Sequence, residues 1–260
     1  TPLYSSAASD VYKRQGYSLN GGLAQSGTIY TFTDVQSAHI IVFNWKEQFY
    51  LTVNSAHDSP SGDGWYDSGA TANAFLSSGT VSGGTDMQYV FTGWSGDASG
   101  TGLTSNDITM NSAKTATANW KTQYYLAMST NFGSISPGNG WYDAGSSVTI
   151  SATAPAADAG ERYVWNGWTG TGTGSYTGTD NPATDAVTVD APITETASWT
   201  RQYYLTVTTN FGTPSGEGWY DAGTNAQATI TPLTVAGAPG TWYVFAGWSG
   251  DASGSGSVSN

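Results

Sequence analysis

The 260-residue chain has no cysteine, so neither disulfides nor thiolate metal sites can hold it together. Charge is scarce too: only 10% of the residues are charged, against about 25% in an average soluble domain. The stability of such a chain must come from packing, from the stacking of repeats or from bound ions.

Basic residues are the rarer charged class, with seven Lys and Arg against 19 Asp and Glu and a formal net charge of -12. The few basic side chains form no cluster, which argues against nucleic acid or an anionic lipid surface as a partner. No stretch approaches the ~18 consecutive apolar residues of a membrane-spanning helix, so we expect no membrane insertion in this segment.

Aromatic residues, in contrast, are abundant: they make up 13% of the chain and include 11 Trp and 16 Tyr. A disordered chain would have few aromatic residues and more charge. The chain is therefore expected to fold, with cores built on Trp and Tyr rather than on Leu and Ile.

Residues 1–15 (TPLYSSAASDVYKRQ) share no composition with the rest of the chain, and they include Lys13 and Arg14, two of the seven basic residues. The string resembles a translated adapter sequence, so we expect it to be non-native and leave it out of the fold prediction. The alternative is a genuine, flexible terminal arm.

Four short signatures recur in the same order along the chain, and this repetition is the strongest signal in the sequence. Successive blocks open at Gln48, Gln123 and Gln202, which are 75 and 79 residues apart. The opening signature (Q-Y-Y-L-T-V in the third block) is followed by G-W-Y-D, then by Y-V-x-x-G-W, then by a closing signature that ends in Trp. The G-W-Y-D copies begin at Gly64, Gly140 and Gly218, the Y-V-x-x-G-W copies end at Trp94, Trp168 and Trp248, and the closing copies end at Trp120 and Trp199.

The repeat boundaries follow from these signatures. We assign residues 46–120 to repeat 1, residues 121–200 to repeat 2 and residues 201–260 to repeat 3. Residues 16–45 match only the closing signature, within residues 35–45, and are expected to be the closing strand of a preceding repeat. Repeat 3 stops before its own closing signature and is therefore expected to lack its closing strand.

Each repeat shows the period-two alternation of β-strands. Leu205 and Val207 alternate with Thr206 and Thr208, and clusters of Gly, Ser, Asp and Pro separate such runs as turns do. No segment shows a sustained helical period with caps. The sequence predicts an all-β fold, a tandem array of small β-sheet repeat domains of about 75–80 residues, β-grasp-like or β-sandwich-like, that forms an extended rod.

The order Q-Y-Y-L-T-V, G-W-Y-D-A-G, Y-V-F-x-G-W-S-G-D and T-M-N-S-A-K-T-A-T-A-N-W resembles the divergent internalin-type B repeat, also called the Listeria–Bacteroides repeat. The resemblance covers about residues 30 to 260. It implies a secreted or cell-surface protein of bacteria or archaea, with repeats that serve as spacers, stalks or adhesive arrays. It also implies a β-grasp-like fold with one short helix, for which the sequence itself gives no signal.

The chain has two histidines, His39 and His57, and neither recurs in the other repeats. A catalytic triad or a zinc site needs histidines joined to carboxylates or a nucleophile, so we interpret both as incidental surface residues. We predict no catalytic residue, no cofactor-binding residue and no metal ligand, and hence that the chain is not an enzyme.

Acidic residues recur at two places. Asp67, Asp143 and Asp221 follow Trp-Tyr in every repeat, and Asp97 and Asp251 lie in Trp-Ser-Gly-Asp loops of repeats 1 and 3. Carboxylates could bind calcium, but no D-x-D-x-D-G run exists, and a lone Asp before Ala-Gly or Ser-Gly is typical of a turn. We predict turn residues, with calcium as the alternative. A paired-carboxylate glycosidase is disfavoured, because nothing singles out one repeat.

The recurring Trp and Tyr side chains have two interpretations. Flat rings could stack on the sugars of surface glycans, whereas fixed positions in every repeat favour core and inter-repeat contacts. A mixed arrangement would bury Trp94, Trp168 and Trp248 and leave Trp65, Trp141 and Trp219 near the surface.

These observations favour an extracellular structural repeat protein, part of a cell-surface filament, stalk or surface layer. Its expected partners are neighbouring repeats of the same chain or further copies associated head to tail. Residues 35–45 of one subunit could complete repeat 3 of the next by β-strand addition, unless the sequence is an internal fragment of a longer array. Two other functions stay open: an adhesin that binds glycans through exposed aromatic rings, and a spacer in a larger secreted enzyme.

Overall fold

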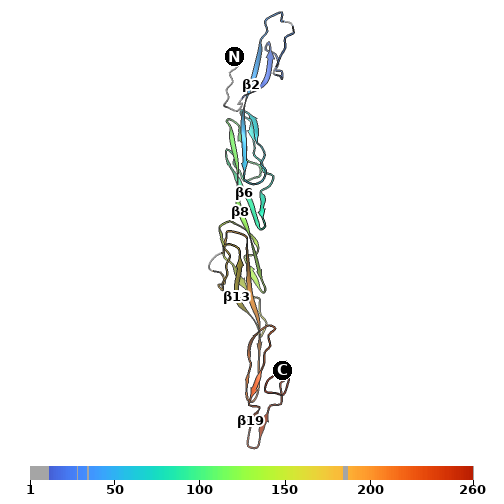
Figure 1. Ribbon diagram of the computed structural model, residues 1–260, viewed down its shortest axis with the longest axis vertical. Coiled ribbons are helices and arrows are strands. Elements are labelled where there is room, and N and C mark those ends of the chain that lie inside the picture. The colour runs from blue at the N-terminus through green and yellow to red at the C-terminus, as the bar shows by residue number, and fades with distance from the viewer. Residues whose placement is uncertain (1–11, 28, 34, 184–186, 260) are drawn as a thin grey trace. The chain divides into compact units, whose positions relative to one another are not determined.

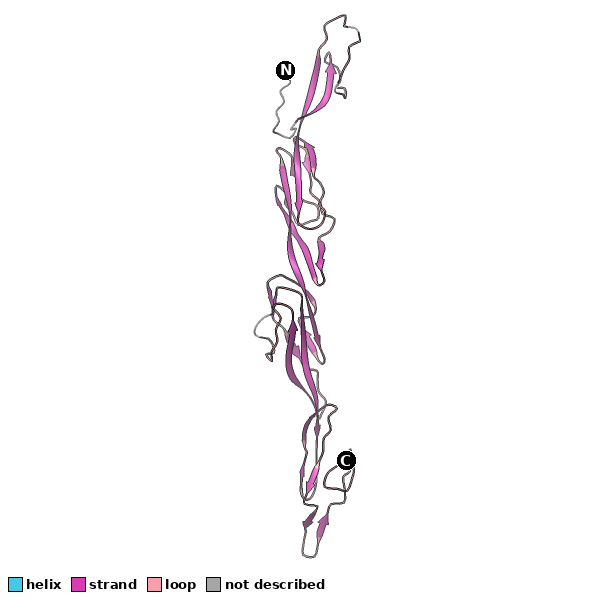
Figure 2. Cartoon of the chain, viewed as in Figure 1, coloured by secondary structure: helices cyan, strands magenta, loops and turns pink. Residues whose placement is uncertain are grey.

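A computed structural model of the chain describes residues 12–27, 29–33, 35–183 and 187–259. These residues form 20 strands, and Figure 2 shows only strands and loops among them. The prediction of an all-β array of small sheets is confirmed, and the described residues do not include the short helix that the family resemblance implied. Residues 1–11, most of the segment predicted to be non-native, lie outside the described residues.

The chain divides into two compact units, Thr1–Gln123 and Tyr124–Asn260 (Figure 1). The strands that begin in the first unit are β1 (Tyr12–Leu19), β2 (Ile41–Ser55), β3 (Gly64–Asp67), β4 (Thr71–Ala72), β5 (Thr80–Gly84), β6 (Met87–Gly96), β7 (Ile108–Thr109) and β8 (Lys114–Thr130). Those of the second unit are β9 (Ser134–Ser136), β10 (Gly140–Asp143), β11 (Ser146–Val148), β12 (Ser151–Thr153), β13 (Glu161–Thr171), β14 (Val187–Val189), β15 (Ile193–Leu205), β16 (Thr213–Ser215), β17 (Gly218–Asp221), β18 (Thr229–Thr231), β19 (Thr234–Ala236) and β20 (Trp242–Val244).

Repeat 1 is built on β2 and β8. Residues 48–51 of β2 pair antiparallel with β3, which carries the G-W-Y-D signature. Residues 51–55 of β2 pair in parallel with β8. β6 pairs with β5 on one side and with β8 on the other, and β4 pairs with β7. The first and last segments of the repeat are therefore neighbours in one sheet.

Repeat 2 has the same arrangement. The later half of β8 pairs in parallel with β15, β10 pairs with β8, and β13 runs antiparallel to β15. Two small sheets, β9–β12 and β11–β14, complete it. These two sheets follow each other closely along the chain: β11 ends at Val148, β12 begins at Ser151, and the two strands pair with different partners.

The cores lie where the period-two alternation places small and branched apolar side chains. In repeat 1 the core contains Leu51, Val53, Ala72, Ala74, Leu76, Trp94, Ala98, Ile108, Met110, Ala116 and Ala118. In repeat 2 it contains Leu126, Met128, Val148, Ile150, Ala152, Trp168, Ala183, Val187, Val189, Ile193, Ala197 and Trp199. Each of these two repeats thus has its own core, closed by one Trp from the Y-V-x-x-G-W signature.

The segment that precedes repeat 1 contains a strand that the sequence analysis did not identify. β1 pairs antiparallel with β2, and the register shifts between Arg14 and Gly16. β13 shows the same shift against β15, between Trp165 and Gly167. β1 therefore stands in the place that the Y-V-x-x-G-W strand has in repeat 2, and residues 16–45 contain part of this strand in addition to the closing one.

Repeat 3 departs from the other two. Its strand β17 pairs with β15, and β16–β18 and β19–β20 form two small sheets. The predicted opening strand ends at Leu205, however, and residues 206–209 are not in a strand. The physical reason is that the described part of the chain places no closing strand beside these residues.

Candidate functional site

The most distinctive feature of the repeats is the contact between their two ends. We call residues 51–55, 126–130 and 205–209 the opening segments, and residues 114–120 and 193–199 the closing segments. In repeat 1 the parallel register runs from Leu51 opposite Lys114 to Ser55 opposite Ala118. In repeat 2 it runs from Leu126 opposite Ile193 to Thr130 opposite Ala197.

Side chains reinforce this contact on both faces of the sheet. On the inner face, Leu126 and Ala197 are fully buried. On the outer face, Ser129 Oγ and Thr196 Oγ1 are 2.9 Å apart. Asn131 then extends the pairing beyond the strand, because its amide donates to the Trp199 carbonyl at 2.8 Å and accepts from the Trp199 N–H at 3.0 Å. The opening and closing segments are thus joined by apolar packing on the inner face and by side-chain hydrogen bonds on the outer face.

In repeat 1, Asp97 also holds the closing segment. Its carboxylate accepts hydrogen bonds from the Thr115 N–H at 2.8 Å and from Lys114 Nζ at 3.2 Å. The Thr115 N–H, and after it the Lys114 side chain, hold the pKa of Asp97 below its usual value. The carboxylate predicted to serve a turn therefore binds the closing strand directly.

Repeat 3 has an open groove where repeats 1 and 2 have their closing segments. A cavity of about 490 Å³ lies between the opening segment and the Y-V-x-x-G-W segment, and its lining includes Leu205, Val207, Tyr243, Trp248 and Asp251. The side chains of Leu205, Val207 and Trp248 are only half-buried, whereas their counterparts in repeats 1 and 2 lie in the core. The groove is therefore lined by both apolar and polar side chains, with the acidic Asp251 among them.

The Asp of the G-W-Y-D signature connects the first residue of the repeat with the turn that follows the signature. Gln48 Nε2 donates to Asp67 Oδ1 at 2.7 Å, and Gln202 Nε2 donates to Asp221 Oδ1 at the same distance. Lys46 also pairs with Asp67. The backbone carbonyl of Asp67 accepts from the Ala70 N–H at 2.9 Å. These carboxylates are used in internal hydrogen bonds, and the described residues contain no group of three or more His, Asp or Glu side chains that could hold a metal ion.

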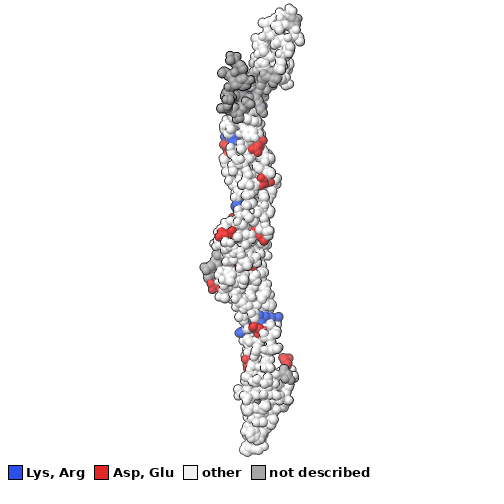
Figure 3. Space-filling view, viewed as in Figure 1, with Lys and Arg blue, Asp and Glu red and all other residues white. Residues whose placement is uncertain are grey.

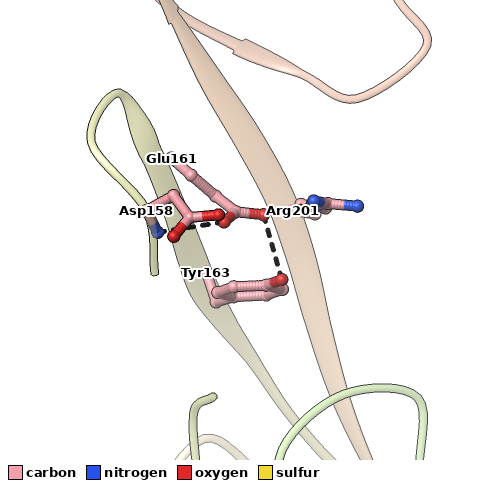
Figure 4. A network of polar contacts seen from close by, with 4 residues as sticks. All are labelled: Asp158, Glu161, Tyr163 and Arg201. Atoms are coloured by element: carbon pink, nitrogen blue, oxygen red, sulfur yellow. Dashed lines mark hydrogen bonds and ion pairs between the residues drawn. The ribbon is translucent and has the colours of Figure 1, made fainter. Parts of the chain in front are cut away.

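A polar network joins repeat 2 to repeat 3 (Figure 4). Glu161, at the start of β13, accepts from the Asp158 N–H at 3.1 Å and from the Tyr163 hydroxyl at 3.0 Å, and it pairs with Arg201 of β15. The Asp158 N–H contributes most to lowering the pKa of Glu161, and the hydrogen bonds from Arg201 and Tyr163 add to it. Partial burial, followed by the Glu161 hydrogen bond, raises the pKa of Tyr163.

The same network reaches the G-W-Y-D hairpin of repeat 3. Arg162 Nε donates to Gln202 Oε1 at 2.7 Å, and the guanidinium lies over the Trp219 ring, 4.3 Å from its centroid. Gln202 in turn binds Asp221. Cation–π and hydrogen-bond contacts therefore link these successive repeats, in addition to the continuous strand.

The tryptophans divide as the mixed interpretation predicted for the well-packed repeats. Trp94 and Trp168 are buried, and Trp141 is 40% exposed. Each partly exposed Trp of a G-W-Y-D signature meets a Tyr of the opening strand edge-to-face, with centroids 5.1 to 5.3 Å apart. This is the geometry of cross-strand aromatic pairs that stabilise a sheet, not that of two coplanar rings.

The two histidines lie against aromatic rings. His57 stacks on Tyr89, with centroids 3.5 Å apart, and meets Trp120 edge-on. The His39 ring lies 4.9 Å from that of Phe32. His57 is thus a packing residue of repeat 1, and His39 belongs to the segment that precedes it.

Sequence analysis missed one buried carboxylate. Glu195 is fully buried in the closing segment of repeat 2, where repeat 1 has Ala116. Its Oε1 accepts from the Tyr176 N–H at 2.7 Å, and its Oε2 has no hydrogen-bond partner among the described residues. Burial raises the pKa of Glu195, against the effect of the Tyr176 hydrogen bond. The signal in the sequence was the position of Glu195 between Ile193 and Ala197, in a strand in which every second residue faces inward.

We expect Glu195→Gln to stabilise repeat 2 at pH 7 by about 1–2 kcal/mol, because it removes a buried charge with an unpaired oxygen. The folded-state pKa of Glu195 is raised, so its stability contribution is complete below the unfolded pKa and falls as the pH rises towards the folded value. Unfolding of both proteins in urea should give similar stabilities at about pH 4 and a growing advantage of the variant up to pH 7. A difference that does not depend on pH would contradict this account.

With this geometry established, the molecule is defined as an all-β tandem-repeat protein whose complete repeats each close by pairing their first and last segments. The chain belongs to the divergent InlB B-repeat domain family, whose model matches residues 50–123 and 124–202. This family is associated with cell-surface proteins. No curated protein and no solved structure matches the chain. The described residues include no helix that could cross a membrane.

Proposed function

We propose that this chain is an extracellular structural element that bears tension in a cell-surface filament, stalk or layer. The association of its family with cell-surface proteins supports the location. The observation that carries the mechanical role is the parallel pairing of the opening and closing segments in repeats 1 and 2. The proposed role is non-catalytic.

Tension along the chain enters a repeat through its opening segment and leaves through its closing segment. Because these two segments are parallel neighbours, a pull in opposite directions slides one along the other. The evenly spaced backbone hydrogen bonds of a parallel pair are then loaded together and not one after another. Repeat 1 has five residue pairs in this register, from Leu51 with Lys114 to Ser55 with Ala118. Such a shear contact resists force better than a contact that can be peeled open.

The connections between repeats support the same role. β8 (Lys114–Thr130) contains the closing segment of repeat 1 and the opening segment of repeat 2, and β15 (Ile193–Leu205) passes from repeat 2 into repeat 3. One strand therefore serves two repeats, and no loop lies between them that could lengthen under load. The network of Glu161, Arg162 and Arg201 adds side-chain contacts to the second of these connections.

The surface chemistry is compatible with a structural role. Figure 3 shows a face on which few charged atoms are scattered among uncharged ones, with no continuous basic patch among the residues drawn in white, red and blue. Only 10% of the residues are charged, and seven of them are basic. A surface of this kind offers little electrostatic attraction to nucleic acids or anionic lipids.

Single-molecule force spectroscopy of the full chain tests the proposal, and the absence of native cysteine allows handles at chosen sites. The variant Tyr50→Cys/Lys121→Cys pulls the start of the opening segment against the end of the closing segment, in shear. The matched variant Tyr50→Cys/Ala113→Cys pulls both segments from the same end and peels them apart. We expect repeat 1 to unfold at a several-fold higher force in the first geometry; equal forces in the two geometries would overturn the mechanical role.

A further inference from the structure

We propose that Asn139 of repeat 2 is a modification site: it loses its side-chain amide by spontaneous deamidation, and the aspartate that forms keeps the structural contact of the asparagine. Asn139 is preceded by Gly138 and followed by Gly140. The glycine that follows has no Cβ to shield its backbone nitrogen, which is the atom that attacks the asparagine side chain. The inference does not depend on the proposed mechanical role.

The three repeats have different residues at this position, which lies directly before the G-W-Y-D signature. Repeat 1 has Asp63, repeat 2 has Asn139 and repeat 3 has Glu217. Asp63 Oδ1 accepts the Val53 N–H at 2.6 Å. Asn139 Oδ1 accepts the Met128 N–H, the equivalent donor of the next opening segment, at the same distance. Repeat 1 therefore already has an aspartate, the residue that deamidation produces, in the contact that Asn139 makes in repeat 2.

The surroundings leave the Asn139 amide free to react. Asn139 is exposed, and its Nδ2 group has no hydrogen-bond partner among the described residues. Gly140 is the first residue of β10, so its nitrogen lies at the end of a strand, where pairing opens most readily. A Cβ at Gly138 would meet no heavy atom within 4 Å, so the chain has open space on the other side of Asn139.

The reaction needs only water. The Gly140 nitrogen loses its proton to water and attacks Cγ of Asn139, which closes a five-membered succinimide ring. The Cγ–Nδ2 bond breaks, and the amide leaves as ammonia. Water then opens the ring at either carbonyl and gives aspartate or isoaspartate. Negative charge develops on Oδ1 during the attack, and the Met128 N–H that already donates to this oxygen stabilises it.

A second Asn-Gly pair in repeat 2, Asn166–Gly167, provides the internal comparison. The Asn166 Nδ2 group donates to Thr200 Oγ1 at 2.8 Å, and Asn166 Oδ1 accepts from the Thr200 hydroxyl at 3.2 Å. Gly167 lies within β13, not at its end. Both ends of the Asn166 amide are therefore held, and these hydrogen bonds must break before its Cγ can be attacked.

Incubation of the full chain at neutral pH in water labelled with oxygen-18, followed by peptide mapping, tests the proposal. We expect the peptide with Asn139 to lose its amide and take up heavy oxygen over days, about tenfold faster than the peptide with Asn166, whose hydrogen bonds protect it. The same chain unfolded in guanidinium chloride should lose both amides at similar rates. An Asn139 amide that persists in the folded chain but is lost in the unfolded one, or equal rates for the two sites in the folded chain, would overturn the proposal.

Gly140→Ala is the matched variant for the attacking nitrogen. The backbone at Gly140 is not left-handed, and an added Cβ would meet only Tyr142, at 3.5 Å, so alanine fits without a clash. Its methyl group hinders the nitrogen, and we expect a several-fold slower loss of the Asn139 amide with no change at Asn166. Equal rates in the variant and the parent chain would show that the Gly140 nitrogen is not the nucleophile.

Asn139→Asp tests whether the product keeps the contact. We expect the Met128 amide proton to exchange as slowly as in the parent chain, measured by nuclear magnetic resonance, because Asp63 makes the same hydrogen bond in repeat 1. Asn139→Ala, which removes the acceptor, should speed this exchange about fivefold. If Asn139→Asp loses protection to the same degree as Asn139→Ala, the aspartate does not replace the asparagine and the proposal fails.

Discussion

Replacing Trp168 by alanine is expected to destabilise repeat 2 by about 3–5 kcal/mol, the cost of removing a large buried aromatic side chain. Trp168 is 2% exposed and packs edge-to-face against Trp165, 5.7 Å away between ring centroids. Small domains bury little surface and have marginal stability, so a loss of this size should unfold most of the repeat. Hydrogen exchange followed by mass spectrometry measures the effect, because lost protection can be assigned to residues 124–200.

The matched control is Trp141→Ala, the same substitution at the 40% exposed Trp of the G-W-Y-D signature. It removes an edge-to-face pair with Tyr125 and should cost about 1 kcal/mol. Repeat 1 should keep its protection in both variants, because its core does not include either residue. If the two substitutions are equally damaging, Trp168 does not organise the core as described.

The repeat unit and its strands could be predicted because both signals are local. Leu51 and Val53 alternate with the polar residues Thr52 and Asn54, which places them on one face, and the structure buries both. The burial of Trp94 and Trp168 agrees with the mixed interpretation of the recurring tryptophans. Local signals of this kind depend only on strand geometry and on side-chain size.

The pairing partners could not be predicted in the same way. Leu51 lies opposite Lys114, which is far away in sequence, and a period-two pattern says which face a residue occupies but not which strand lies beside it. The parallel contact of the opening and closing segments, and with it the mechanical hypothesis, therefore came from the structure. The role of Asp97 has the same origin: its loop predicted a turn, but its partner is the closing strand.

Glu195 shows a different limit. An acidic residue within a strand is usually placed on the solvent face, because burying a charge is costly. Here the alternation of Ile193, Glu195 and Ala197 puts the carboxyl group in the interior, where only one of its oxygens is hydrogen-bonded among the described residues. The period-two alternation places Glu195 on the inner face, whereas the cost of burying a carboxylate predicts the outer face.

Replacing Gly167 by alanine is expected to destabilise repeat 2 by about 2–4 kcal/mol, through backbone strain and a backbone clash. Gly167 has φ +121° at the register shift of β13, and a Cβ at this position would lie 2.6 Å from the Gly178 carbonyl oxygen. That oxygen accepts the Trp168 N–H at 2.7 Å, so the glycine brings the following loop against the strand and seats the core Trp. Urea unfolding and the hydrogen exchange of residues 124–200 measure the loss.

Gly145→Ala is the control in the same repeat. Gly145 has φ +79°, and a Cβ there would meet no heavy atom within 4 Å beyond its chain neighbours. Alanine should therefore destabilise the repeat only by about 1 kcal/mol, the cost of the left-handed backbone conformation, because it causes no clash. Equal losses at the two sites would mean that strain alone matters and that the approach of Gly178 does not. A larger loss at Gly167 would show that one close contact, present also between Gly247 and Gly254 of repeat 3, builds the Trp pocket of each repeat.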